Sequence, residues 1–201
     1  MENKILETFL HNYKLKFNEL QKATSIRSNK LAYHLNKLQE EGVIEKDNEN
    51  YQLNKIHESK IPFISKHQSP LPVLLILIKN KDKVFLIKRN KRPYKEKLGL
   101  PGGRILLNET ISEATKRIMK DKFDIKVNLD KVNSVSLEHV KNNEEKTIHS
   151  FVLFLVTAKT NQELEMTNPK EVKDKIITSD YWLIKNNSEK EIKIDYLVSE
   201  E

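Results

Sequence analysis

The chain has 201 residues, of which 37% are hydrophobic and 32% charged, a composition typical of a soluble globular protein rather than a disordered one. It contains no cysteine, which excludes disulfides, cysteine-ligated zinc and a thiol nucleophile, and which is compatible with a reducing compartment. The net charge of +7 indicates either polyanionic partners or only a general richness in lysine. No signal-peptide core is present, and the longest apolar run, Leu71 to Ile78, is far shorter than the roughly 20 residues that span a bilayer, so we expect a cytoplasmic protein.

Residues 1–53 predict three helices and a hairpin. From apolar spacing, the expected elements are helices over residues 5–10, 17–23 and 28–41, followed by strands over 43–46 and 51–53. The third helix is the clearest, because Leu31, Leu35 and Leu38 share one face. Ser28 is expected to be its N-cap, and Gly42 to end it in the left-handed conformation.

Residues 54–72 contain Pro62, Pro70 and Pro72 and no sustained hydrophobic period, which predicts a linker. From Val73 onward, apolar segments predict strands over 73–78, 84–87, 148–157 and 176–183, and a single helix over 111–123. Residues 186–201 are charged but carry several apolar side chains. We expect them to pack either on the rest of this domain or on a second subunit. The expected domains are therefore 1–53 and 73–201, joined by a linker over 54–72.

The predicted helix over 28–41 offers a face suited to DNA. Its N-terminal part presents side chains that read bases or meet phosphates: Arg27, Ser28, Asn29, Lys30, Tyr33, His34 and Lys37. Residues 14–37 hold six basic residues against one acid, Glu19, although residues 1–53 as a whole balance at eight each. The predicted hairpin carries acidic residues, which makes it less suited to enter the minor groove of DNA. We therefore expect the helix to make the main contact with DNA.

The order of these elements, and the sequence from Ser28 to Ile44 in particular, resemble the recognition helix and wing of winged helix-turn-helix regulators. The resemblance implies binding to double-stranded DNA, and by analogy a homodimer. The alternative is a winged helix that serves protein contacts or dimerisation. Both interpretations stay open.

The segment Leu98–Arg104 carries a second pattern, in which a glycine pair lets the backbone approach a ligand closely. Glu109 lies six residues after Gly103, and Arg117 lies eight residues after Glu109. This spacing resembles the box of the Nudix family, and the resemblance covers roughly residues 70–185. It implies an α/β/α sandwich with a mixed sheet, and the α+β fold expected for the whole chain is a winged-helix domain (three helices plus a β-hairpin) followed by this sandwich. It also implies hydrolysis of nucleoside diphosphate derivatives, with Mg²⁺ or Mn²⁺ held by carboxylates of the box.

The box is damaged where the family expects three glutamates. Ile118 stands at the first position, Asp121 at the second and Lys122 at the third. Only Glu109 and Asp121 remain as catalytic and metal-binding candidates, with Glu113 one helical turn after Glu109 as a possible helper. Lys122 either places its ammonium where a metal would sit, and so neutralises a diphosphate, or is an ordinary solvated lysine. No cofactor is certain, and Mg²⁺ or Mn²⁺ is expected only if the protein hydrolyses its ligand.

Several further residues are candidates for ligand binding. The expected ligand-binding set consists of Arg89, Arg92, Gly102, Gly103, Arg117 and Lys122, with Lys95 and Tyr94 as weaker candidates. We expect Arg117 to pair with Glu109 and brace the loop against the helix. Glu144 and Glu145 are either a general base or a solvated loop, and His139 and His149 are expected to be structural or exposed.

Three functions are compatible with this organisation. The first is a DNA-binding transcriptional regulator whose impaired Nudix domain senses a nucleotide-like phosphorylated metabolite such as ADP-ribose, as in the Nudix-related regulators that the chain resembles. In the relatives known to have this arrangement the DNA-binding domain follows the Nudix domain, whereas here it comes first. The second is an active metal-dependent Nudix hydrolase with an accessory winged helix, and the third is a scaffold for protein contacts. Metal-dependent turnover distinguishes the second function, and salt-dependent DNA binding counts against the third.

Overall fold

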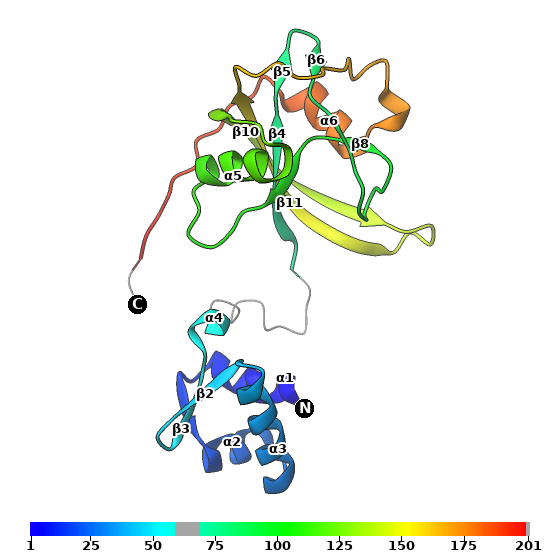
Figure 1. Cartoon of the computed structure of the whole chain (residues 1–201). Helices are drawn as coiled ribbons and strands as arrows, with labels where there is room; N and C mark the ends of the chain where they lie inside the picture. The colour runs from blue at the N-terminus through cyan, green and yellow to red at the C-terminus, as the bar shows by residue number, and fades with distance from the viewer. Residues whose placement is uncertain (59–68, 200–201) are drawn as a thin grey trace. The chain divides into compact units, whose positions relative to one another are not determined.

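The computed structural model describes residues 1–58 and 69–199 (Figure 1). It divides into two compact units, Met1–Ser69 and Pro70–Glu201, and each is described by itself. The central part of the predicted linker, including Pro62, falls at residues 59–68 and lies outside the described residues. Within the described ranges, no helix combines the length and the apolar character needed to cross a membrane.

The N-terminal unit packs short helices against a small antiparallel sheet. Its elements are α1 (Glu2–Leu6), the 3-10 helix η1 (Glu7–Leu10), β1 (Lys14–Lys16), α2 (Phe17–Thr24), α3 (Ser28–Glu40), β2 (Ile44–Asp47), β3 (Asn50–Leu53) and α4 (Lys55–Glu58). The strands pair in the order β1–β3–β2, and β1 was not predicted from the sequence. Helix α3 buries Leu31, Leu35 and Leu38, as its hydrophobic period predicts.

The two ends of α3 differ in how well the sequence predicts them. Gly42 has a φ of +67°, which confirms the left-handed residue expected after the helix. The prediction that Ser28 is the N-cap is wrong, because Ser28 is the first helical residue and Arg27 is the N-cap. The Ser28 hydroxyl instead accepts a hydrogen bond of 2.8 Å from the Gln21 side chain of α2, which ties the two helices together.

The C-terminal unit is built on a mixed four-stranded sheet. Its elements are β4 (Leu71–Leu77), β5 (Lys79–Asn80), β6 (Lys83–Val84), β7 (Ile87–Lys88), β8 (Leu98–Gly99), β9 (Gly102–Arg104), α5 (Ile111–Phe123), β10 (Asn128–Lys141), β11 (Thr147–Lys159), η3 (Lys173–Lys175) and α6 (Thr178–Asn187). The main sheet has the order β10–β11–β4–β9, in which only β11 and β4 run parallel. Two further two-stranded ladders pair β5 with β6 and β7 with β8.

Alternate residues of the central strands enter two separate cores, one on each face of the sheet. Leu74 and Ile76 of β4 pack with Ile118 of α5 on one face. Leu75 and Leu77 pack with α6 on the other face. This alternation follows from the pleat of a strand, whose successive side chains point to opposite faces. The unit is therefore a sheet between α5 and α6, and α5 has the bounds that the sequence predicts (Figure 1).

The prediction of a strand over residues 176–183 is wrong. Ile176 and Ile177 are extended and bond to Leu98, but helix α6 begins at Thr178 and continues to Asn187. The β-branched and aromatic residues favour a strand locally, whereas packing of α6 on the sheet decides the outcome. Strand β10 was not predicted from the sequence, because bulges interrupt its alternation.

The C-terminal tail docks in part on its own unit. Ile192 forms an isolated bridge to Val132 at the edge of the sheet. The Asn133 side chain donates to the carbonyls of Ser188 and Lys190, at 2.8 and 3.0 Å. Residues 188–192 therefore pack on the C-terminal unit itself, which is one of the two positions expected for this segment.

Candidate functional site

The glycine pair of the box lies in β9, where it packs against β4 and α5. A Cβ atom on Gly102 would lie 2.5 Å from the Leu74 carbonyl oxygen, so only glycine fits this approach of two strands. A Cβ atom on Gly103 would lie 3.0 Å from the Ile118 side chain and 3.1 Å from the Lys122 ammonium. The backbone of β9 thus contacts the box helix closely at the two positions where the damage occurs.

Glu109 and Arg117 brace the loop that connects β9 with α5, as the sequence predicts. The Arg117 guanidinium donates to both Glu109 carboxylate oxygens, one of them at 2.9 Å, and also to the Arg104 carbonyl at 2.9 Å. Glu109 in turn accepts from the Leu106 amide at 2.9 Å. The hydrogen bond from Arg117 holds the pKa of Glu109 below its ordinary value. The Glu109 carboxylate is therefore engaged by donors of the protein itself.

The other acidic positions of the box, and the positions where the family places glutamates, do not gather carboxylates at one point. Ile118 is fully buried between α5 and the sheet, Asp121 is exposed, and Glu113 is held in the capping box with Thr110. Lys122 donates to the Gly102 carbonyl at 2.5 Å. Across residues 1–58 and 69–199, no group of three or more histidine or acidic side chains is arranged to hold a metal ion. Magnesium prefers several oxygen ligands, and the side chains at the box do not fit that requirement.

Basic side chains surround the Lys122 ammonium. Partial desolvation, and then the positive charges of Arg117, Arg89 and Lys91, lower the pKa of Lys122. The structure therefore brings together Arg89, Arg117 and Lys122 of the predicted ligand-binding set with Gly102 and Gly103. Lys91 joins this group and was not predicted, while Arg92 is exposed and does not line the cavity described next.

A cavity of about 80 Å³ lies on the α6 side of the sheet, and of these cations Arg89 lines it. Apolar side chains form most of its wall, and polar groups of Arg89, Tyr94, Glu138 and Asp180 converge on it. Glu138 accepts a hydrogen bond of 3.0 Å from the Tyr94 hydroxyl, and a second one from Ser179. Convergence of a few polar groups on an apolar wall is a feature of ligand sites, and a cavity of this size accommodates only a small part of a ligand.

Asp180 is the buried acid of this cavity, with 4% of its surface exposed. One of its carboxylate oxygens accepts from the Leu100 amide at 2.7 Å. Burial raises the pKa of Asp180 to about 7, against this hydrogen bond, which lowers it. The pKa of Tyr94 is likewise raised, first by burial and then by the charge of Glu138.

Asp180 and Glu138 were not predicted as site residues from the sequence. Asp180 lay in a segment assigned to a strand, and Glu138 lay in the strand that was missed. A single acid has no spacing pattern that reveals its burial, and the residues of α6 show no clear apolar face that would have placed Asp180 on the inner side of a helix. Tyr94, a weaker candidate in the sequence, does line the cavity with Arg89.

The other candidates in this unit lie elsewhere. Glu144 and Glu145 pair with Lys146 and Lys141 in the exposed turn between β10 and β11. His139 contacts the Ser150 hydroxyl at 2.9 Å, and His149 stacks on Phe151. Lys95 lines a separate open hollow with Lys97 and Asp174.

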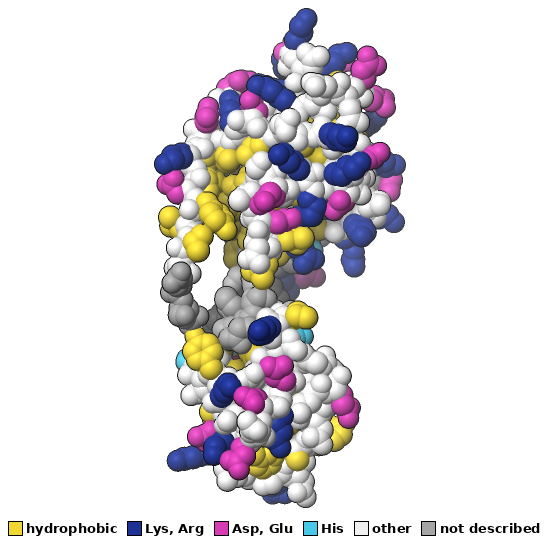
Figure 2. All heavy atoms as spheres, turned by 60° about the vertical axis from the view of Figure 1, so that its left-hand side comes forward, with side chains coloured by type: hydrophobic (Ala, Val, Ile, Leu, Met, Phe, Trp, Pro, Cys, Tyr) yellow, Lys and Arg dark blue, Asp and Glu magenta, His cyan; other side chains and the backbone are white. Residues whose placement is uncertain are grey.

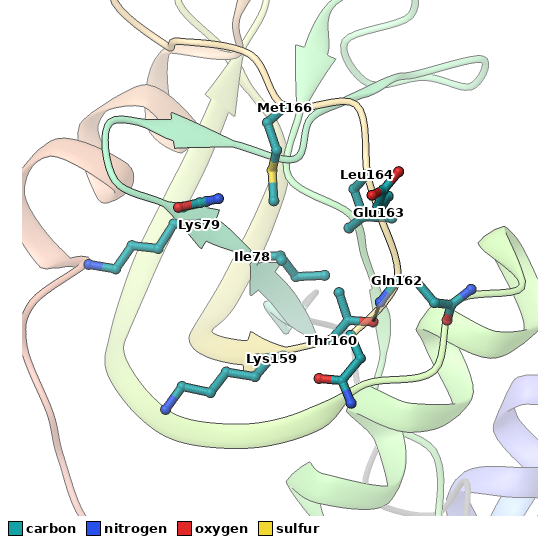
Figure 3. A pocket seen from close by; sticks show the side chains of 11 residues that line it. Ile78, Lys79, Lys159, Thr160, Gln162, Glu163, Leu164 and Met166 are labelled. Atoms are coloured by element: carbon teal, nitrogen blue, oxygen red, sulfur yellow. Dashed lines mark hydrogen bonds between the residues drawn. The ribbon is translucent and has the colours of Figure 1, made fainter.

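A larger hollow of about 500 Å³ lies at the other end of the main sheet, beyond the last residues of β4 and β11 (Figure 3). Ile78, Leu164 and Met166 supply its apolar lining. Its two lysines are already neutralised, because Lys79 pairs with Glu189 and Lys159 pairs with Asp130. It therefore offers no free positive charge for an anion, in contrast to the group around Lys122.

The candidate DNA-binding residues of α3 fall into two groups. Arg27, Ser28, Asn29, Lys30 and Tyr33 are exposed, and Tyr33 retains 64% of its surface. His34 and Lys37 are instead tied to Glu2 of α1, the lysine at 2.9 Å. Lys14 and Lys16 of β1 pair with Asp47 and Glu49, two acids of the β2–β3 hairpin.

Comparison with known proteins identifies the class of the C-terminal unit. The family model described as the NUDIX domain matches residues 69–183, more than half of the chain. The chain therefore belongs to the Nudix family. No curated protein matches it.

Solved structures similar to this chain include three hydrolases or related enzymes. A NUDIX hydrolase from Nitrosomonas europaea shares 19% identity over 59% of this chain and 70% of its own, with a TM-score of 0.43. A MutT NUDIX hydrolase from Burkholderia pseudomallei shares 15% identity over 59% of this chain and 98% of its own, with a TM-score of 0.47. A bifunctional NMN adenylyltransferase/ADP ribose pyrophosphatase from Francisella tularensis shares 15% identity over 84% of this chain and 50% of its own, with a TM-score of 0.42.

Proposed function

We propose that the Nudix domain of this protein binds a nucleotide-like phosphorylated ligand without hydrolysing it, and that this binding regulates attachment of the N-terminal unit to DNA. The observation that carries the first half is the state of the box. A buried isoleucine and a lysine that bonds to the Gly102 carbonyl replace two of the carboxylates that a metal needs. The ligand's phosphates would lie at the cations around Lys122, and Arg89 belongs both to this group and to the wall of the cavity of Tyr94 and Asp180.

The element order of the N-terminal unit supports the second half. Helix, strand, helix, helix and hairpin, with the sheet order β1–β3–β2, are typical of a winged helix-turn-helix. Arg27, Asn29 and Lys30 stand exposed at the beginning of α3, the position from which a recognition helix contacts bases and phosphates. His34 and Lys37 contribute to this function only if DNA displaces Glu2 from them. Binding as a homodimer is part of the proposal by analogy.

The proposal is tested by measuring the affinity of the full chain for duplex DNA over a series of salt concentrations. We expect an Arg27→Ala, Lys30→Ala double variant to bind DNA at least about tenfold more weakly and with a shallower salt slope, because two phosphate or base contacts are removed. Lys4→Ala, which removes a charge from α1, serves as the control and should leave the affinity nearly unchanged. Addition of ADP should shift the affinity of wild type for DNA. Equal affinity for the double variant and wild type would contradict a DNA-binding role for α3.

Metal-dependent hydrolysis is the second candidate function, and membership of the Nudix family supports it more directly than it supports regulation. It would use Mg²⁺ or Mn²⁺ held by Glu109, Asp121 and Glu113. In the structure Glu109 is bound to Arg117 and Glu113 to Thr110, so both would have to exchange internal partners for the metal. Turnover that requires the metal and disappears in Asp121→Ala distinguishes this function from the first.

A further inference from the structure

The Lys122 side chain lies against the glycine pair of β9. Its ammonium donates to the Gly102 carbonyl at 2.5 Å. It also lies 3.1 Å from the point that a Cβ atom of Gly103 would occupy, so the absence of a side chain there leaves room for it. The ammonium is thus positioned by backbone of the box loop, and does not simply extend into solvent.

This ammonium has no acidic partner in the described part of the chain. The charged groups that act on it are Arg117, Arg89 and Lys91, all of them cations, and Glu109 is paired with Arg117. An ammonium has three N–H donors, and the Gly102 carbonyl uses one. Two donors and an excess of positive charge therefore remain for an anion at this point.

A diphosphate needs compensation of its negative charge and donors for its oxygens, and a divalent cation is one way to supply the charge. A lysine fixed on a backbone carbonyl supplies positive charge of its own, and lysine is a common partner of phosphate groups in proteins. Lys122 carries a single charge, but Arg89 and Lys91 add two more nearby. Unlike a metal, this arrangement provides no bound water that could attack phosphorus.

We propose that Lys122 replaces the divalent cation, so that this domain binds the diphosphate of a nucleoside diphosphate without metal. The inference rests on the proposed function, because it concerns the same ligand site. It goes further in stating that binding is independent of Mg²⁺, and that magnesium bound to the ligand in solution weakens binding by reducing the ligand's charge.

The test is calorimetric titration of the full chain with ADP and with inorganic pyrophosphate, each in excess EDTA and in excess Mg²⁺. We expect wild type to bind both probes in EDTA and to bind them more weakly in Mg²⁺. Lys122→Gln retains a side-chain N–H that reaches toward Gly102 but removes the charge. We expect it to bind about 10- to 100-fold more weakly in EDTA, the loss associated with a charge-assisted hydrogen bond. Lys120→Gln removes a charge from the same helix, where Lys120 pairs with Asp124, and should change the affinity by less than about threefold.

Two different failures are distinguishable. Binding that requires Mg²⁺, or a Lys122→Gln variant with the affinity of wild type, would overturn the role of Lys122 while leaving a ligand-binding domain. Absence of binding to either probe under both conditions would overturn the proposed function, and the inference with it. Circular dichroism of each variant confirms that a loss of binding does not come from unfolding.

Discussion

Asp180 is a buried carboxyl whose hydrogen bond to the Leu100 amide does not compensate for its loss of solvation. Its pKa in the folded protein is raised to about 7, against 3.8 for the ordinary group. Between about pH 4 and pH 7, the Asp180 carboxyl is therefore protonated in the folded state and ionised in the unfolded state. The contribution of the protonated group to stability is fully present below about pH 4 and is lost as the pH rises through about 7.

We expect Asp180→Asn to remove this part of the pH dependence. Its amide oxygen can still accept from Leu100, but it does not ionise. The free energy of unfolding of wild type should fall by up to about 3–4 kcal/mol between pH 4 and pH 8 relative to the variant, which follows from about three units of raised pKa. Urea denaturation at several pH values measures the difference. Asp174→Asn, at an exposed acid, is the control, and equal pH dependence in wild type and Asp180→Asn would contradict the buried, protonated carboxyl.

At the scale of one element, helix α5 shows why a change at the box affects both chemistry and packing. Ile118 belongs to the core between α5 and the sheet, together with Ala114 and Met119. Lys122, one turn further along, reaches the Gly102 carbonyl. Restoration of the family glutamate at position 118 would therefore place a carboxylate in an apolar core unless the helix shifts.

We expect Ile118→Glu to lower the free energy of unfolding by about 3 kcal/mol or more, because it buries an unpaired charge in the core. Ile118→Val should cost only about 1 kcal/mol. Lys120→Glu, on the exposed side of the same helix, should change stability by less than about 1 kcal/mol. Chemical denaturation compares the three variants, and an Ile118→Glu protein as stable as the Lys120→Glu protein would show that position 118 faces solvent.

Elements with a strong local pattern could be predicted from the sequence, whereas those shaped by long-range packing could not. Helix α5 has its predicted bounds because Thr110 and Glu113 form a capping box and its apolar residues recur at helical spacing. Helix α6 was mistaken for a strand because Ile176, Ile177 and Tyr181 favour strands locally. The same holds for the residues of the candidate site. The spacing from Gly103 to Lys122 predicts the box, whereas Asp180 and Glu138 come together only in the folded protein.

At the scale of the whole molecule, charge is divided unequally between the units. Residues 1–53 hold eight basic and eight acidic residues, so the net charge of +7 comes from residues 54–201. Basic and acidic side chains are interspersed on the visible face of the C-terminal unit (Figure 2). Net charge alone therefore does not mark the candidate DNA-binding surface, which rests on the local excess of cations at α3, whereas the cations around Lys122 suit a small anionic ligand.

We propose above that this Nudix domain binds a phosphorylated ligand but does not hydrolyse it. The most direct measurement is turnover by the purified full chain with Mg²⁺ or Mn²⁺ and a panel of ADP-ribose, dinucleotides, nucleotide sugars and nucleoside triphosphates. We expect no hydrolysis of any of these compounds above the uncatalysed rate. Metal-dependent hydrolysis by wild type that is abolished in Asp121→Ala would contradict it, and would make the protein a hydrolase whose N-terminal unit is accessory.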